Sequence, residues 1–103
     1  MNYCELSDVK PVLQLEIEEA THDPELSSCV ASASALLDAL LKVEGLTVPS
    51  VVPQLIVDAS KFLAAWDFRR RRDPVGAVAF MEEASKILDA YIQGEKETYV
   101  GSV

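Results

Sequence analysis

The sequence is short of the residues from which metal and nucleophilic sites are built. It holds two cysteines, Cys4 and Cys29, without C-x-x-C spacing, and one histidine, His22. A zinc site would therefore have to recruit carboxylates, and a general base would have to be a histidine that lies just before a helix start. We expect both cysteines to be small buried hydrophobes in a reducing compartment, and His22 to be a solvated loop residue.

Glycine is also scarce. The four glycines are scattered at expected helix ends and near the C-terminus, so no glycine-rich loop is present that could hold phosphates. The acidic residues Glu16, Glu18, Glu19, Asp23 and Glu25 do not follow the calcium-loop pattern, and a solvated negative face is the simpler interpretation. The sequence therefore predicts no catalytic, cofactor-binding or metal site, and no enzyme activity.

Long apolar runs are absent as well. No uninterrupted stretch reaches the roughly 18 residues of a membrane span, and the opening MNYCELSDVK has neither the basic nor the apolar region of a signal peptide. We therefore expect a soluble chain that is not exported. With 103 residues, 50% of them hydrophobic, the chain fits one globular domain around one core.

Helix start and stop signals predict an all-α fold, a compact bundle of about four helices. The expected helices are a short one capped by Asp8 and ending near Leu15, a long one capped by Asp23 and ending at Glu44-Gly45, a third capped by Ser50, and a fourth from Asp73-Pro74 to Gly94. The long helix carries an apolar stripe of Leu26, Cys29, Ala33, Leu36, Leu40 and Val43, widened by Val30, Leu37 and Leu41. The third and fourth helices form an αα-hairpin because almost no linker separates them. Residues 1–94 form the single domain, and residues 95–103 form a flexible C-terminal tail that is either frayed or docks on a neighbour.

Four consecutive arginines, Arg69, Arg70, Arg71 and Arg72, end the third helix of a chain whose formal net charge is -8. We call them the arginine block. Such an acidic chain does not attract the phosphate backbone of nucleic acid by its summed charge.

Three interpretations of the arginine block remain open. The arginines complement the helix dipole and pair with the nearby acids Asp67, Asp73, Glu82 or Glu83. They pair with an acidic surface of another subunit. They contact nucleic-acid phosphates. Because four consecutive positions span more than a helical turn, at least one guanidinium is expected to face outward or across an interface.

Several segments together carry a resemblance. They are the opening Tyr3-Cys4-Glu5-Leu6-Ser7-Asp8-Val9, the long Ala/Ser/Leu helix from Asp23, the segment Val52-Pro53-Gln54-Leu55, and Asp58-Ala59-Ser60-Lys61-Phe62-Leu63-Ala64-Ala65-Trp66 running into the arginines. In this order of features, over roughly residues 3–94, the chain resembles the small head-tail connector (head-completion, or adaptor) proteins of tailed bacteriophages and prophages.

The resemblance implies a structural virion protein that is made in the host cytoplasm and lies at the head-tail junction. Its subunits would form a homo-oligomeric ring below the portal protein, let genome DNA pass through the lumen without sequence-specific binding, and offer a surface to tail or stopper proteins. By position, residues 23–45 match the long helix of the family and residues 95–103 match its tail, which contacts neighbours. No cofactor, metal or membrane is implied.

We therefore expect subunit or partner contacts at two places. The residues are Arg69, Arg70, Arg71 and Arg72 in the arginine block and Tyr99, Val100 and Val103 in the tail. The alternative function is that of a small helical nucleic-acid-binding or regulatory protein that uses the arginine block, and it predicts an affinity that falls steeply with salt.

Overall fold

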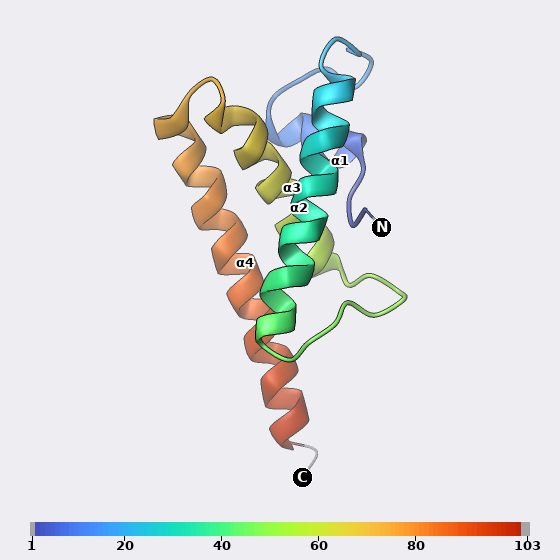
Figure 1. Ribbon diagram of the computed structural model, residues 1–103, viewed down its shortest axis with the longest axis vertical. Helices are drawn as coiled ribbons and strands as arrows, with labels where there is room; N and C mark the ends of the chain where they lie inside the picture. The colour runs from blue at the N-terminus through green and yellow to red at the C-terminus, as the bar shows by residue number, and fades with distance from the viewer. Residues whose placement is uncertain (1, 102–103) are drawn as a thin grey trace.

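Four helices form the computed structural model, which describes the backbone of residues 2–101 and the side chains of residues 2–97 (Figure 1). They are α1 (Leu6–Val12), α2 (Asp23–Val43), α3 (Gln54–Arg70) and α4 (Pro74–Gly101). Over residues 2–101 the chain contains no β-strand. The predicted all-α class, the long second helix and the hairpin of the third and fourth helices are confirmed.

The helix α3 is central because small and aliphatic residues cover much of its surface. Ala59, Ala64 and Ala65 are fully buried beside Ile56 and Leu63, and such small side chains allow neighbouring helices to approach closely. α3 packs along α4 on one side and along α2 on the other, and α1 packs on both α3 and α2. As a result, α2 and α4 flank α3 and lie apart along most of their length (Figure 1).

The helix α2 supplies the deepest part of the core. Leu26, Leu37 and Leu41 are fully buried, and burying a leucine side chain stabilises a fold by about 1.5–3 kcal/mol. By length and composition α2 would also suffice to cross a membrane, a property that core helices of globular proteins share. One flank of the same apolar stripe stays open, since Leu36 and Leu40 are 37% and 39% exposed. The broad stripe predicted for this helix is therefore only partly buried.

The ends of α1 differ from the prediction. The backbone N–H of Glu5 donates a hydrogen bond of 2.8 Å to the Asp8 carboxylate, so Glu5 is the N-cap and Asp8 is the third helical residue. The helix ends at Val12 and does not reach Leu15, because Gln14 adopts a left-handed conformation with φ of 61°. This reversal starts the loop of residues 13–22 that leads to α2.

The later helix boundaries also need correction. α3 is capped by Pro53 in an extended conformation and not by Ser50. The predicted end of the fourth helix at Gly94 is wrong, because this glycine keeps a helical backbone and α4 continues to Gly101. One glycine inside a helix costs only about 1 kcal/mol relative to alanine. The predicted tail of residues 95–103 is thus mostly the last part of α4, and the predicted domain boundary falls inside a helix.

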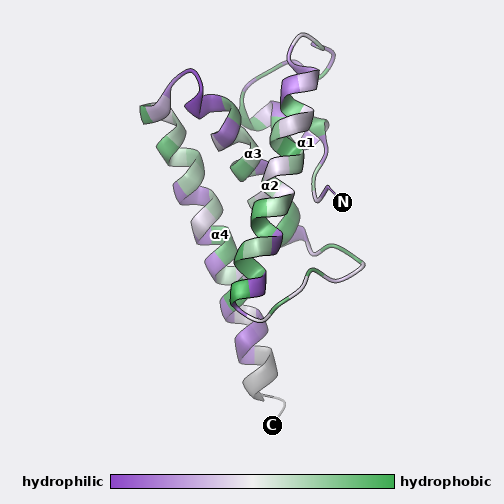
Figure 2. Cartoon of the chain, viewed as in Figure 1, coloured by the Kyte–Doolittle hydropathy of each residue, from purple (hydrophilic) through white to green (hydrophobic). Residues whose placement is uncertain are grey.

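The hydrophilic segments lie at the two ends of the hairpin. The turn between α3 and α4 and residues 93–97 near the end of α4 are mostly hydrophilic (Figure 2). Near this last part, Lys96 Nζ lies 2.5 Å from Glu44 Oε2 at the end of α2. The molecule measures 51 × 28 × 19 Å, and α4 extends past the ends of α2 and α3 (Figure 1).

Candidate functional site

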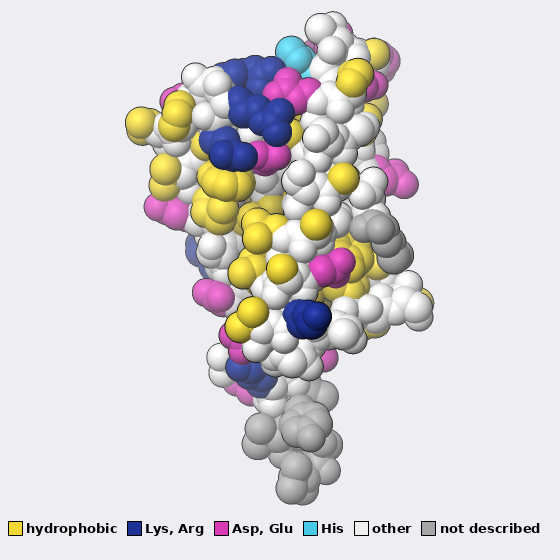
Figure 3. Space-filling view, in the orientation of Figure 1, with side chains coloured by type: hydrophobic (Ala, Val, Ile, Leu, Met, Phe, Trp, Pro, Cys, Tyr) yellow, Lys and Arg dark blue, Asp and Glu magenta, His cyan; other side chains and the backbone are white. Residues whose placement is uncertain are grey.

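The arginine block lies where α3 ends and turns towards α4. Arg70 is the last helical residue and Arg71 is the C-cap, so the four side chains do not wind around a continuous helical turn as the sequence predicted. They gather instead on one end of the molecule, with acidic side chains between them (Figure 3). The contacts of these guanidinium groups therefore decide what the block can do.

Two carboxylates bind three of the arginines. The Asp67 side chain is 9% exposed; its Oδ1 accepts a hydrogen bond of 2.8 Å from Arg70 Nε, and its Oδ2 accepts one of 3.2 Å from Arg71 Nη2. Glu25, at the start of α2, accepts hydrogen bonds from Arg71 Nη1 at 3.1 Å and from Arg72 Nη2 at 2.6 Å. These contacts tie the end of α3 to the beginning of α2.

Three of the guanidinium groups make cation–π contacts with aromatic rings. Their distances from ring centroids are 5.7 Å for Arg69 over Phe80, 4.8 Å for Arg70 over Trp66 and 3.9 Å for Arg72 over Phe68. His22 packs edge-on against Phe68, with ring centroids 5.3 Å apart. His22 lies in the loop before α2, as expected, but it is half-buried rather than fully solvated, because its ring packs against Phe68.

The acidic partners of the block were only partly predicted. Of the four nearby acids, Asp67 pairs with arginines, whereas Asp73 caps α4 by accepting a hydrogen bond from a backbone N–H of the first turn. Among the described side chains, neither Glu82 nor Glu83 pairs with an arginine. Glu25 was not predicted, because the packing of α2 against α3 brings it to the block from a distant part of the sequence.

These contacts shift ionisation in the directions that physical chemistry requires. The hydrogen bond from Arg72 lowers the pKa of Glu25, and the same bond raises the pKa of Arg72. Burial, with the Asp67 carboxylate as a further cause, raises the pKa of the Cys29 thiol to about 12. Cys29 is therefore a protonated thiol at neutral pH, and both cysteines are free and buried, as the sequence predicted.

The arginine block keeps a positive surplus. Its four arginines outnumber the two bound carboxylates by two charges, and since the whole chain carries -8, the rest of the chain carries -10. Arg70, Arg71 and Arg72 keep side chains that are 42–50% exposed. This end is thus a small cationic, accessible surface on an otherwise acidic molecule.

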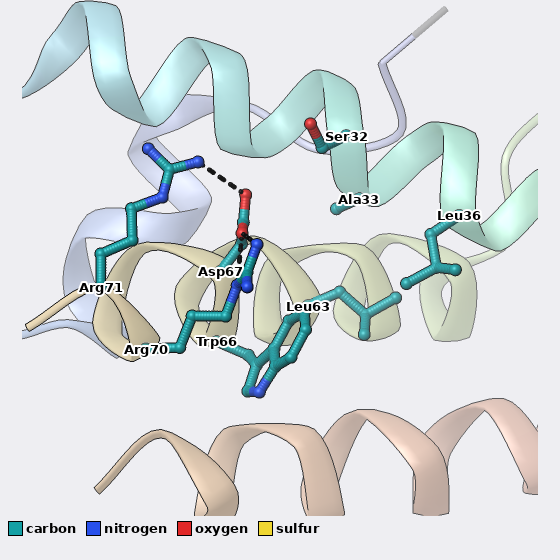
Figure 4. Close-up of a pocket in the computed structure, with 8 residues that line it drawn as sticks. All are labelled: Ser32, Ala33, Leu36, Leu63, Trp66, Asp67, Arg70 and Arg71. Carbon is teal, nitrogen blue, oxygen red and sulfur yellow. Dashed lines mark hydrogen bonds and ion pairs between the residues drawn. The ribbon is translucent and has the colours of Figure 1, made fainter. Parts of the chain in front are cut away.

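An apolar groove begins beside the arginine block, between α2 and α3, and continues between α2 and α4 with α3 as its floor. The hollow near the arginines has a volume of about 190 Å³ and is lined by Ser32, Ala33, Leu36, Leu63, Trp66, Asp67, Arg70 and Arg71 (Figure 4). The next hollow has about 330 Å³ and is lined by Leu36, Leu40, Leu63, Met81, Ala84, Ser85 and Leu88. Because Leu36 and Leu63 line both, the two hollows adjoin, and we call them together the groove. Hydrophobic side chains along it reach the surface (Figure 3).

A second cationic cluster is buried and consists of one lysine with the acceptor groups around it. Lys10 of α1 is 5% exposed, and its Nζ donates hydrogen bonds to the backbone carbonyls of Ile17 at 2.9 Å and Glu19 at 2.7 Å. The same Nζ lies 2.9 Å from Asp23 Oδ1, which is buried and makes no well-aligned hydrogen bond, so this contact is an ion pair. Asp23 was predicted to cap α2, but it is the first residue of the helix. The N-cap is His22.

The remaining predicted contact residues lie at the C-terminus. The backbone of Tyr99 and Val100 belongs to α4, but their side chains, and all of Val103, lie outside the described residues. Their role in contacts between subunits stays a prediction.

Neither a metal-ligand cluster among the described side chains nor a similar known protein indicates a function for this chain. Over the part of the chain that the structure describes, no group of three or more His, Cys, Asp and Glu side chains is placed to hold a metal ion. No family model, no curated protein sequence and no solved structure matches this chain. The arginine block and the adjoining groove are therefore the surface on which a function has to rest.

Proposed function

We propose that this chain is a structural assembly subunit, a head-tail connector of a tailed bacteriophage or prophage, which forms a homo-oligomeric ring beneath the portal protein. The order of sequence features supports this class. The observation that carries the proposal is the open apolar groove that ends at the arginine block. An exposed apolar groove bounded by charged residues is typical of a protein-binding surface, and binding of this kind needs no catalytic group.

The charge distribution supports assembly through this surface. A subunit with a surplus of two positive charges at one end and -10 elsewhere is attracted to an acidic part of its neighbour. In a ring, the acidic remainder would give a lumen that repels the DNA backbone and lets the duplex pass. The portal protein on one side and a tail or stopper protein on the other would be the further partners in the virion.

The geometry of the arginines favours this function over nucleic-acid binding. Three guanidinium groups already donate to Asp67 and Glu25, and a phosphate would have to displace these carboxylates or bind beside them. Nucleic-acid binding depends on the number of phosphates neutralised by free cations. A surplus of two charges on an acidic chain supplies few of them.

Light scattering coupled to size exclusion tests the proposal. We expect a species with the mass of a ring, whose fraction increases with protein concentration and which dissociates at high salt. Electron micrographs should show closed rings with a central opening. A monomer at every concentration and salt would contradict self-assembly. Binding of duplex DNA at about 50 mM salt, lost steeply at higher salt, would support the alternative function.

A further inference from the structure

An isoleucine flanked by acids projects from the loop between α1 and α2. Ile17 is 57% exposed, and its neighbours Glu16 and Glu18 are exposed as well. We call Glu16, Ile17 and Glu18 the acidic knob. Its composition, one branched aliphatic side chain between two carboxylates, is the complement of an apolar hollow with a cationic border.

The buried Lys10 holds the backbone of the acidic knob in place. Its ammonium group binds the carbonyl of Ile17 itself and that of Glu19 two residues later. On the far side of the knob, the backbone N–H of Thr21 donates a hydrogen bond of 2.9 Å to the Glu19 side chain. A loop that is ordered before binding loses less conformational entropy when it docks, so the knob is prepared for a contact outside the molecule.

The hollow at the arginine end of the groove provides the matching features. Leu36, Leu63 and Trp66 form its apolar wall, and its volume of about 190 Å³ accommodates a branched aliphatic side chain. Arg70 and Arg71 border it with side chains that are 50% and 42% exposed. Arg70 and Arg71 already pair with Asp67 and Glu25, but the arginine block as a whole has two positive charges more than these bound carboxylates.

We propose that the acidic knob of one copy docks into the arginine end of the groove of the next copy. Ile17 would contact the wall formed by Leu36 and Trp66, while the two glutamates of the knob face Arg70 and Arg71. The inference rests on the proposed self-assembly and specifies its interface. The occupant is a second copy because the chain itself carries an apolar anchor flanked by carboxylates, and the arginine block beside the hollow has more cations than bound carboxylates.

The proposed contact is heterologous. The knob belongs to the loop before α2, whereas the arginine end of the groove lies between α2 and α3, so each copy offers one knob and one groove at different places. Repeated contacts of this type generate a closed ring when the rotation between copies closes, and a filament when it does not.

Two variants and two matched controls test the contact by light scattering. Ile17→Ser removes the anchor of the knob, and Leu36→Gln places a polar group on the wall shared by both hollows. We expect each to weaken assembly at least about tenfold, as the loss of one buried aliphatic side chain predicts. Val51→Ser and Val43→Gln make similar changes at sites that are 84% and 85% exposed and outside the groove; both should assemble like the unmodified chain. Circular dichroism verifies that all four variants are folded.

A mixture of the two assembly-defective variants gives the sharpest result. Ile17→Ser retains an intact groove and Leu36→Gln retains an intact knob, so a 1:1 mixture should form heterodimers and nothing larger. Assembly of either variant at the unmodified affinity, or a mixture that stays monomeric, would overturn the knob-and-groove contact. An unmodified chain that never self-associates would instead overturn the proposed function, and the contact with it.

Discussion

The two cationic clusters of this chain place positive charge in opposite ways. Lys10 is a single cation, 5% exposed, and its three contacts are two backbone carbonyls and Asp23 of its own chain. The arginine block has four cations and two bound carboxylates, and three of its side chains stay 42–50% exposed. The lysine is thus committed to the fold, whereas the block retains charge and accessible surface for a partner.

The difference teaches how to separate structural from functional charge. A buried cation must have every donor satisfied, because an unpaired polar group in the interior costs free energy. A half-exposed cation pays little for remaining unpaired, since water solvates it. The fold should therefore tolerate the loss of charge in the arginine block better than the loss of Lys10.

The largest effect is expected for Lys10→Met. The change leaves the carbonyls of Ile17 and Glu19 and the Asp23 carboxylate without their partner, which should lower the free energy of unfolding by about 2–4 kcal/mol. Urea unfolding followed by circular dichroism measures it. The control is Lys86→Met, whose side chain is 79% exposed, and its effect should stay below about 0.5 kcal/mol. Equal effects of the two changes would show that Lys10 contributes no more to the stability of the fold than an exposed lysine does.

A smaller loss is expected for Asp67→Asn within the arginine block. The variant keeps the shape of the side chain but loses the charge that Arg70 and Arg71 bind, and because both arginines are half-exposed the cost should be only about 1 kcal/mol. Asp58→Asn is the matched control on the same helix, where the ion pair with Lys61 is local and partly exposed. A loss for Asp67→Asn as large as that for Lys10→Met would show that the block, too, is a structural cluster.

The smallest effect concerns the pH dependence of Glu25. Its pKa is lowered from the ordinary value of 4.5 by the hydrogen bond from Arg72, so its contribution to stability is complete above this value and is lost as the pH falls through the lowered pKa. The difference in unfolding free energy between the unmodified chain and Glu25→Gln should therefore be constant from about pH 6 to pH 7 and shrink in acid. Urea titrations at several pH values check it, and a difference independent of pH would contradict the ion pair.

Much of the fold could be predicted from the sequence because helix starts depend on local chemistry. The residues Asp23-Pro24-Glu25 placed the start of α2 within one residue of its position, since proline fits only the first turn of a helix. Gly94 gave a false end, because the residues after it gain a contact, Lys96 with Glu44, that only the packed structure supplies. Local signals therefore predicted the starts of α2 and α4 and the end of α2, but not the starts of α1 and α3 or the ends of α1 and α4.

The candidate site could be predicted only in part. The arginine block was visible as composition, but its partner Glu25 lies 46 residues before Arg71, and nothing in the sequence specifies which helices pack together. The groove was hidden for the same reason: Leu36 and Leu40 share the apolar stripe of α2, yet the distance between α2 and α4 leaves them open. The buried Lys10 gave no signal, since a single lysine is normally exposed.

The position of Trp66 makes it an intrinsic fluorescence probe of the groove. It is the only tryptophan of the chain, it lines the hollow at the arginine end, and the Arg70 guanidinium lies 4.8 Å from its ring centroid. Any molecule that fills this hollow displaces water from the indole ring, and indole fluorescence responds to such a change in polarity. Emission excited at the tryptophan band can therefore follow binding at this one place, without a label, for any partner that has no tryptophan of its own.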